Sequence, residues 1–190
     1  MSEQVYQIAV PGPSPVTLEE MKTYLKIPAA NTSSDLLIQE LIDAATAWGE
    51  GYTGRAFRAN QWNLLLDYFP PSIVIRRHPV DTIDSIEYLV DTVSTPVDPA
   101  TYYLRAGVQT GEILLFPDQT WPDNVDDRLQ AITVTFTTSI YPRKFDTIRL
   151  FIKRFVAYVF VNRGDCVCDE ESAVASGALP LLGQMRIARV

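Results

Sequence analysis

Apolar residues recur every three or four positions in three segments of the chain, which is the period of a helix with one buried face. The predicted helices cover residues 17–27, 34–53 and 146–162. Thr17 and Glu20 form a capping box at the start of the first helix. Pro28 follows the first helix and Gly54 follows the second, and both residue types are typical of helix ends.

Between these segments the apolar residues alternate with polar ones, as they do in a strand with one buried face. The clearest example is Trp62, Leu64, Leu66 and Tyr68. The predicted strands cover residues 61–68, 73–77, 83–89, 102–105, 112–116 and 131–138. Proline, glycine and aspartate separate them, so we expect a small antiparallel sheet, sandwich or barrel.

The order of helices, strands and a further helix predicts an α+β fold with an inserted β module. We expect residues 17–58 and 142–165 to form one helical bundle and residues 59–141 to form the antiparallel β insertion. Residues 1–16 contain three closely spaced prolines, which favour an extended N-terminal arm. Residues 166–190 are expected to be a flexible tail.

The composition is that of an ordinary globular protein, with 190 residues of which 47% are hydrophobic and 21% charged. Because 23 Asp and Glu outnumber 16 Lys and Arg, the net charge is −7, which argues against a general nucleic-acid binder. The N-terminal residues lack the basic segment of a secretion signal, and the longest apolar run is far shorter than the roughly 20 residues of a membrane helix. We therefore expect a cytosolic protein with no membrane segment.

Residues 49–54 match the pattern G-x-G-x-x-G of dinucleotide-binding loops. That chemistry needs the glycines at the start of a helix, where backbone N–H groups meet the pyrophosphate. Here the glycines lie at the end of a predicted helix, where the partial charge is negative. Helix termination and close packing are the better interpretation.

A few other side chains could carry chemistry: His78, the pair Cys166 and Cys168, and the acidic group Asp123, Asp126 and Asp127. The only histidine has no recognisable nucleophile or carboxylate partner in the sequence. The two cysteines lack the spacing of a zinc site, and the aspartates lack the glycine and spacing of a calcium loop. We expect no catalytic site, cofactor or metal.

The charges are unevenly distributed along the chain. Residues 143–163 contain six basic residues and one acid, whereas residues 1–53 contain seven acids and two lysines. Two explanations remain open. The two regions are unrelated solvated faces, or they are complementary sides of a contact repeated between subunits, because head-to-tail rings join two different surfaces.

Several short segments occur in an order that resembles one protein family. They are 16–25 (VTLEEMKTYL), Asp35-x-x-Ile38-x-x-Leu41-Ile42-x-Ala44-Ala45, Tyr52-Thr53-Gly54-Arg55, Trp62-x-Leu64-x-Leu66-Asp67, Pro79-Val80, Thr120-Trp121-Pro122, Val134-Thr135-Phe136 and Asn162-Arg163. Together they cover most of residues 15–165. The arrangement resembles the head–tail connector, or adaptor, proteins of tailed bacteriophages, in the variety with a β insertion.

The resemblance implies a structural protein without catalytic activity. Such a protein is made in the host bacterial cytoplasm and assembles in the virion neck beneath the portal protein, as a homo-oligomeric ring of about twelve subunits. The ring extends the channel, lets DNA pass without specific binding, and provides the platform for a downstream neck or tail protein.

In such an assembly, the apolar tail and the basic face of the third helix predict two groups of contact residues. The predicted portal-docking residues are Leu179, Leu181, Leu182, Met185, Arg186, Ile187 and Arg189, on a tail whose small-residue stretch 173–178 is expected to be mobile. The alternative is that this tail folds back on its own helical bundle. The predicted intersubunit or portal contacts are Arg149, Lys153 and Arg154.

Two other functions compete with the connector. A small-ligand-binding or enzymatic α+β domain would use a pocket in the β region, with polar groups converging in a concave site. A head-closure or tail-terminator protein would occupy another position in the neck. The two N-terminal helices argue against the latter, because those proteins are mainly β.

Overall fold

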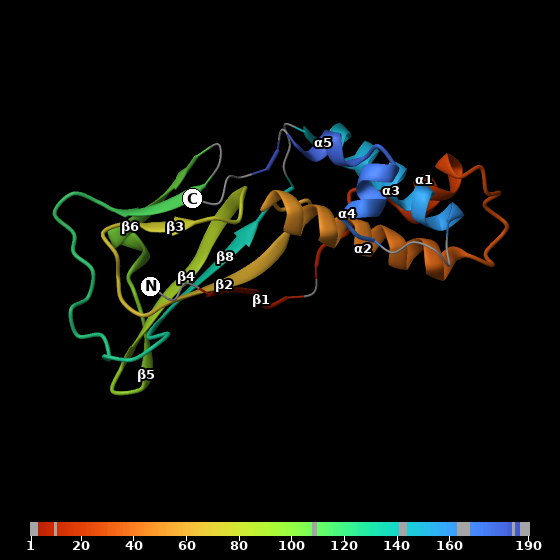
Figure 1. Ribbon diagram of the computed structural model, residues 1–190. Coiled ribbons are helices and arrows are strands. Elements are labelled where there is room, and N and C mark those ends of the chain that lie inside the picture. Colours follow the sequence, from red (N-terminus) through yellow and green to blue (C-terminus); the bar gives the residue numbers. More distant parts are fainter. Residues whose placement is uncertain are drawn as a thin grey trace. The chain divides into compact units, whose positions relative to one another are not determined.

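A computed structural model of the chain describes residues 4–9, 11–107, 110–140, 144–162, 168–183 and 185–186 (Figure 1). Within these residues, five helices and eight strands in antiparallel sheets confirm the predicted α+β fold. The chain divides into two compact units, which we call the β unit (Met1–Gly12 with Ala59–Ser139) and the helical unit (Pro13–Arg58 with Ile140–Val190). None of the helices among these described residues is both long and apolar enough to cross a membrane.

The helical unit contains α1 (Leu18–Tyr24), α2 (Asp35–Thr53), α3 (Phe145–Val161), α4 (Glu170–Ala175) and α5 (Leu179–Gly183). The capping box is complete, since Glu20 N donates to Thr17 Oγ1 and Thr17 N donates to Glu20 Oε2, both over 3.2 Å. Helix α2 ends at Gly54, whose φ of 72° is the left-handed conformation that glycine adopts without strain.

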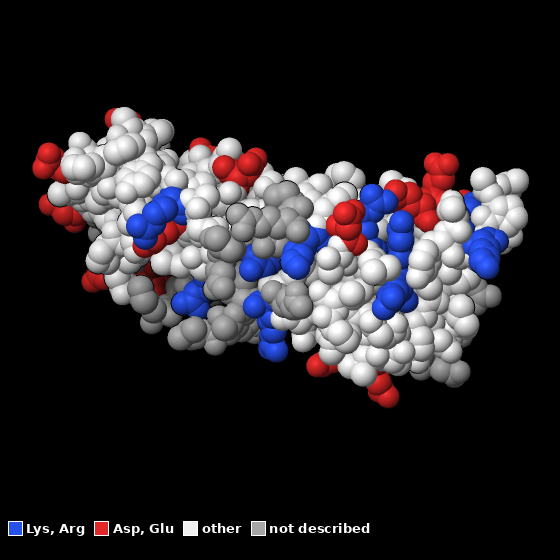
Figure 2. Space-filling model, turned by 90° about the horizontal axis from the view of Figure 1, so that it is seen from above, with Lys and Arg blue, Asp and Glu red and all other residues white. Residues whose placement is uncertain are grey.

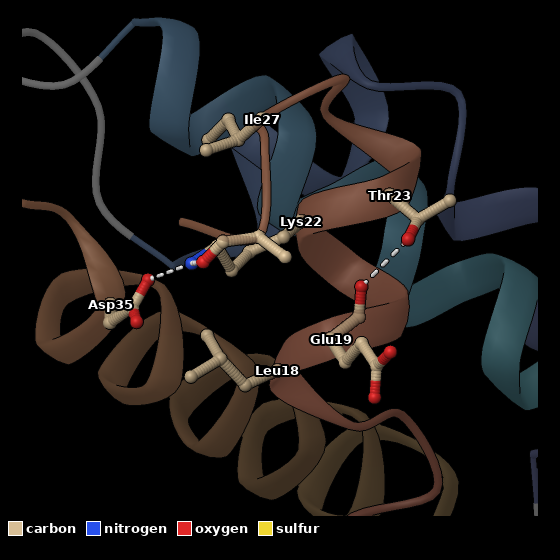
Figure 3. Close-up of a pocket in the computed structure, with 7 residues that line it drawn as sticks. Leu18, Glu19, Lys22, Thr23, Ile27 and Asp35 are labelled. Atoms are coloured by element: carbon tan, nitrogen blue, oxygen red, sulfur yellow. Dashed lines mark hydrogen bonds and ion pairs between the residues drawn. The ribbon is translucent and has the colours of Figure 1, made fainter. Parts of the chain in front are cut away.

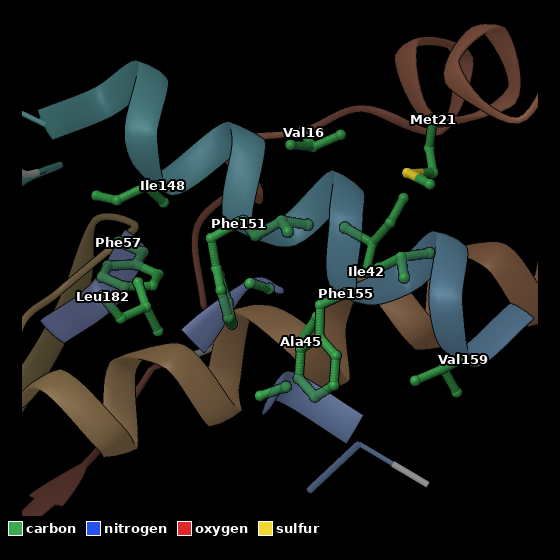
Figure 4. Close-up of a cluster of buried hydrophobic side chains, with 14 of the residues drawn as sticks. Val16, Met21, Ile42, Ala45, Phe57, Ile148, Phe151, Phe155, Val159 and Leu182 are labelled. Atoms are coloured by element: carbon green, nitrogen blue, oxygen red, sulfur yellow. The ribbon is translucent and has the colours of Figure 1, made fainter. Parts of the chain in front are cut away.

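The core of the helical unit lies mainly between α2 and α3, with α1, α4 and α5 packed around them (Figure 4). Its fully buried side chains are Val16, Met21, Ile38, Ile42, Ala45, Phe57, Ile148, Phe151, Ile152, Phe155, Val156, Val159, Ala173, Ala178, Leu182 and Met185. A Cβ on Gly49 would lie 2.5 Å from Phe57 and 2.9 Å from Phe151. In the G-x-G-x-x-G pattern, Gly49 therefore allows close packing and Gly54 ends the helix.

The described part of the C-terminal segment differs from the expected mobile tail. Residues 173–178 were predicted to be too small to build a core, yet Ala173 and Ala178 are fully buried, and Leu182 and Met185 are buried with them. Asp169 caps α4 by accepting a hydrogen bond from Ser172 N over 2.9 Å. The small side chains allow α4 and α5 to approach α3 closely. Their contribution to the core is this close packing rather than a large buried apolar area of their own.

The β unit contains a five-stranded and a three-stranded antiparallel sheet. The first has the order β1-β2-β8-β4-β5, with bounds Gln4–Gln7, Asn60–Leu66, Ile132–Thr138, Val80–Val90 and Val93–Pro96. The second has the order β3-β7-β6, with bounds Ile73–Ile75, Gly111–Leu115 and Tyr102–Ala106. A short 3₁₀ turn, Pro99–Thr101, precedes β6.

Two strands were not predicted. The first is β1, which lies in the expected N-terminal arm and pairs with β2 from Gln4 opposite Leu65 to Gln7 opposite Trp62. The second is β5, which forms a hairpin with the end of β4. The arm therefore divides at Gly12, so that its first residues belong to the β unit.

The alternation in β2 and β8 places one apolar face inside the β unit. Burial alternates along both strands, and Leu64, Val134 and Phe136 are fully buried. Tyr68, which was predicted to continue the pattern, lies beyond the end of β2 and is 54% exposed. The buried residues of this core are Trp62, Leu64, Leu66, Ile73, Ile75, Val80, Ile86, Val97, Tyr102, Ile113, Ile132, Val134 and Phe136.

Candidate functional site

The predicted basic face of α3 is partly used inside the helical unit. Arg149 forms an ion pair with Glu20 of α1, and its guanidinium lies 5.6 Å from the centre of the Phe145 ring. Burial raises the pKa of Glu20, but the Thr17 N–H and the charges of Arg149 and Lys153 outweigh it and lower the pKa on balance. Arg149 therefore holds α1 against α3, which is a role within the subunit.

The other two predicted contact residues on α3 are less engaged. Lys153 is half-buried. Arg154 is exposed, and among the described residues its one hydrogen bond is a long 3.5 Å contact from its Nη1 to Gly177 O. Figure 2 shows the helical unit's Lys and Arg side chains interspersed with Asp and Glu on the face it displays, rather than gathered in one patch. Of the three predicted residues, Arg154 is the one most available for another chain.

The predicted docking residues lie close to the end of α2. Met185 O accepts a 2.6 Å hydrogen bond from Arg55 Nε, and the Arg186 guanidinium lies 5.1 Å from the Tyr52 ring centre. Leu182 and Met185 are buried, whereas Leu179 and Leu181 are half-buried against the same core. Ile187 and Arg189 lie outside the described residues. This arrangement agrees with the alternative that the tail folds back on its own bundle.

A cavity of about 250 Å³ lies between α1 and the start of α2 (Figure 3). Lys22, only 5% exposed, extends along it, donates to Ala29 O over 3.0 Å and pairs with Asp35 over 2.7 Å. A buried ion pair with an added hydrogen bond keeps the ammonium group compensated. The pair connects α1 to the start of α2 and fixes the loop between the two helices, which is a role within the subunit.

A groove of about 350 Å³ opens on the β unit between the end of β2 and the loop 117–131. Its apolar part is built on Phe69 and Trp121, whose rings stack with centres 4.7 Å apart and planes 3° apart. Its acidic residues are Asp67, Asp123, Asp126 and Asp127. The sequence showed the aspartates and the Thr-Trp-Pro turn, but Phe69 was not recognised as part of any site.

The groove's carboxylates differ in how many hydrogen bonds they accept from the described residues. Asp126 accepts hydrogen bonds from Asp91 N and Thr92 N, both over 2.9 Å, and so fixes the β4–β5 turn. Asp67 accepts one from Gln130 N over 2.9 Å. Asp123 and Asp127 are exposed and make no hydrogen bond or ion pair to any described residue. These two carboxylates are therefore free to meet a positive charge.

The remaining candidates do not form a reactive site. His78 is buried in the β unit, at 7% exposed. Burial and the nearby Asp169 raise the pKa of the Cys168 thiol, which disfavours the reactive thiolate. Cys166 lies outside the described residues. Within the described part of the chain, no three His, Cys, Asp or Glu side chains gather in a way that could hold a metal ion.

Residues 15–90 match the model of the family described as phage gp6-like head-tail connector protein. This segment includes α1, α2 and the strands from β2 to β4. The search of curated proteins found no match.

Solved structures with the same fold come from gene transfer agent (GTA) particles. A chain from the neck of an empty GTA particle, computed with C6 symmetry, has a TM-score of 0.77 and 17% identity over 98% of this chain and 97% of that one. A chain from the virion of a native GTA particle has a TM-score of 0.76 and 18% identity over 98% of this chain and 96% of that one. A chain from the neck of a native GTA particle, computed with C12 symmetry, has a TM-score of 0.74 and 17% identity over 98% of this chain and 97% of that one.

At these identities the structural matches show the fold, and they do so over nearly the full length of both chains. The match to the connector family is independent of them, because it rests on the sequence of residues 15–90. The family is one of structural proteins rather than enzymes. Together, the family match and the shared fold support a head–tail connector protein with a structural role.

Proposed function

We propose that the chain is the subunit of a cyclic ring in the neck of a phage-like particle, between the portal protein and a downstream neck or tail protein. The observation that carries this proposal is the agreement between the family match and a fold shared, at 98% coverage, with neck proteins solved with C6 and C12 symmetry. The C12 symmetry of one of these necks supports a ring of about twelve copies.

The charge of the strands in the β unit is our reason for proposing that DNA passes the ring without binding to it. The strands of the five-stranded sheet contain no Lys or Arg, whereas β4 carries Asp81, Asp84 and Glu87. Burial raises the pKa of Asp84, but hydrogen bonds from Gln61, Thr137 and Thr82 lower it on balance, so this carboxylate is charged at neutral pH. Strands that carry carboxylates and no Lys or Arg disfavour binding of the phosphate backbone, because that binding needs clustered cations.

The portal and the downstream protein are the proposed partners. Portal docking by the C-terminal segment stays a prediction, and it requires Leu182 and Met185 to leave the core in which they lie. The intersubunit or portal contact of α3 is proposed for Arg154 and Lys153 in particular, because Arg149 is paired with Glu20.

Locating the chain in particles tests the proposal. A tagged chain should be found by electron microscopy as cyclic density at the portal vertex, and particles made without the portal gene should lack it. Density at the tail tip or on the capsid faces would refute a neck position. In a separate assay, DNA-cellulose should not retain the chain at about 100 mM salt, whereas a Thr133→Lys, Thr135→Lys variant of the sheet should be retained.

A further inference from the structure

The groove on the β unit has the chemistry of a receptor for a cationic side chain that is flanked by apolar groups. Trp121 and Phe69 offer an aromatic surface, and Tyr68 beside them is 54% exposed. The indole Nε1 of Trp121 is buried and has no hydrogen-bond acceptor among the described residues. The groove thus presents the partly exposed rings of Phe69 and Trp121 together with the carboxylates of Asp123 and Asp127, which have no partner among the described residues.

A matching ridge lies on α3 in the helical unit. Leu150, Arg154, Ala157 and Val161 follow one another at intervals of four, three and four residues, so they share one stripe of the helix. Leu150 is 38% exposed and Val161 75% exposed, although both are apolar. Arg154 lies between them, and its only hydrogen bond to a described residue is the long one to Gly177 O. The ridge thus presents a guanidinium between two exposed aliphatic side chains.

We infer that the groove of one copy receives the Arg154 ridge of a neighbouring copy, as the contact that joins subunits head to tail. The inference rests on the proposed ring. A cyclic assembly requires two different, complementary surfaces on each chain, and this chain carries both. The guanidinium stacks on the aromatic floor and pairs with Asp123 and Asp127, while the aliphatic side chains cover Tyr68 and Trp121.

Charge alone favours a second copy as the occupant. The loop 117–131 carries four aspartates and one arginine, whereas α3 has Asp146 as its one acid and exposes Arg154 beside the half-buried Lys153. The two surfaces are therefore attractive toward each other, and each is repulsive toward its own kind. Such a pattern favours a heterologous contact over a symmetric dimer.

Two variants remove one side of the contact each. The groove variant combines Asp123→Lys with Asp127→Lys, and the ridge variant is Arg154→Glu. The matched controls are Glu40→Lys with Asp81→Lys for the groove and Arg76→Glu for the ridge, since these side chains are exposed and lie outside both surfaces. Melting temperature and circular dichroism should show that all variants remain folded.

Sedimentation velocity over a range of concentrations measures the assembly. We expect each single-surface variant to need at least about tenfold more protein than wild type for half-maximal association, because charge reversal turns an attractive contact into a repulsive one. The controls should assemble like wild type. The chain with both sets of substitutions should regain assembly, since its charges are again complementary.

Mixing the two defective variants gives the sharpest test. The groove variant keeps its ridge and the ridge variant keeps its groove, and the substituted basic groove also complements the substituted acidic ridge. Both contacts between the two variants are therefore attractive, so the mixture should assemble although neither variant does so alone. No assembly in the mixture, no recovery in the combined variant, or a wild-type chain that stays monomeric up to millimolar concentration would overturn the inference. None of these results would refute the neck position, which particle imaging tests independently.

Discussion

The C-terminal segment offers the most direct test of how the helical unit is held together. Leu182 is fully buried in the core, next to Ala173 and Ala178. Truncating a fully buried leucine to alanine removes apolar contacts and leaves a cavity, at a cost of about 2–5 kcal/mol. At about 2–4 °C per kcal/mol for a chain of this size, a loss of about 3 kcal/mol lowers the melting temperature of Leu182→Ala by roughly 6–12 °C.

The control for this prediction is Val174→Ala on α4. Val174 is 58% exposed, so the same kind of truncation should change stability by less than about 0.5 kcal/mol. Deleting residues 173–190 should lower the melting temperature further than Leu182→Ala, because it removes all four buried side chains of the segment and the acceptor of the Arg55 hydrogen bond. Differential scanning calorimetry measures each change.

A different outcome would refute this reasoning. If Leu182→Ala and the deletion both melt within about 1 °C of wild type, the segment contributes nothing to the core in solution and is a free arm. Loss of portal binding without loss of stability would then support the docking role. A large drop in melting temperature would instead mean that docking must first break contacts within the subunit.

Three further predictions follow from individual contacts. Asp126→Ala should lower the free energy of unfolding by about 1–3 kcal/mol, because it leaves Asp91 N and Thr92 N without their acceptor, and the effect should appear in urea denaturation. Gly49→Ala should cost about 1–3 kcal/mol by forcing a Cβ against Phe57, whereas Gly51→Ala, which meets nothing within 4 Å, should be neutral or slightly stabilising. Asp84→Asn should destabilise the chain at pH 7 and this difference should shrink in acid. The folded pKa of Asp84 lies below its ordinary value of 3.8, so its contribution is present above that pH and is lost as the pH falls through the folded pKa.

The three long helical segments and most strands could be predicted because their burial is periodic in the sequence, whereas the short helices α4 and α5 lie in the segment expected to be a flexible tail. Where the prediction was wrong, tertiary pairing or backbone geometry decided the outcome. Helix α1 ends at Tyr24 rather than at residue 27, since the chain turns at Lys26 with a φ of 59°. Strand β1 has too few apolar residues to be recognised and exists because β2 offers it an open edge.

The candidate sites were harder to predict because they depend on residues that meet only in three dimensions. Phe69 and Trp121 belong to different segments, and nothing in either one's neighbours indicates that their rings stack. The basic residues of α3 were treated as one face, yet Arg149 and Arg154 are five positions apart, which is about 140° around a helix. One therefore pairs with Glu20 while the other is exposed.

In an acidic chain, the cations that are not used within the subunit are the ones available for assembly. Lys22, Arg58, Arg105 and Arg149 each form an ion pair with an acid of the same unit, so their charges are compensated before any partner arrives. Arg154 lacks such a pair among the described residues and lies between exposed aliphatic side chains. On the β unit, Asp123 and Asp127 are exposed and have no ion pair with any residue that the structure describes. Because burying an uncompensated charge is costly, a contact that joins these groups gains more than one that must first break an internal pair. The choice of Arg154 over Arg149 as the assembly residue follows from this difference.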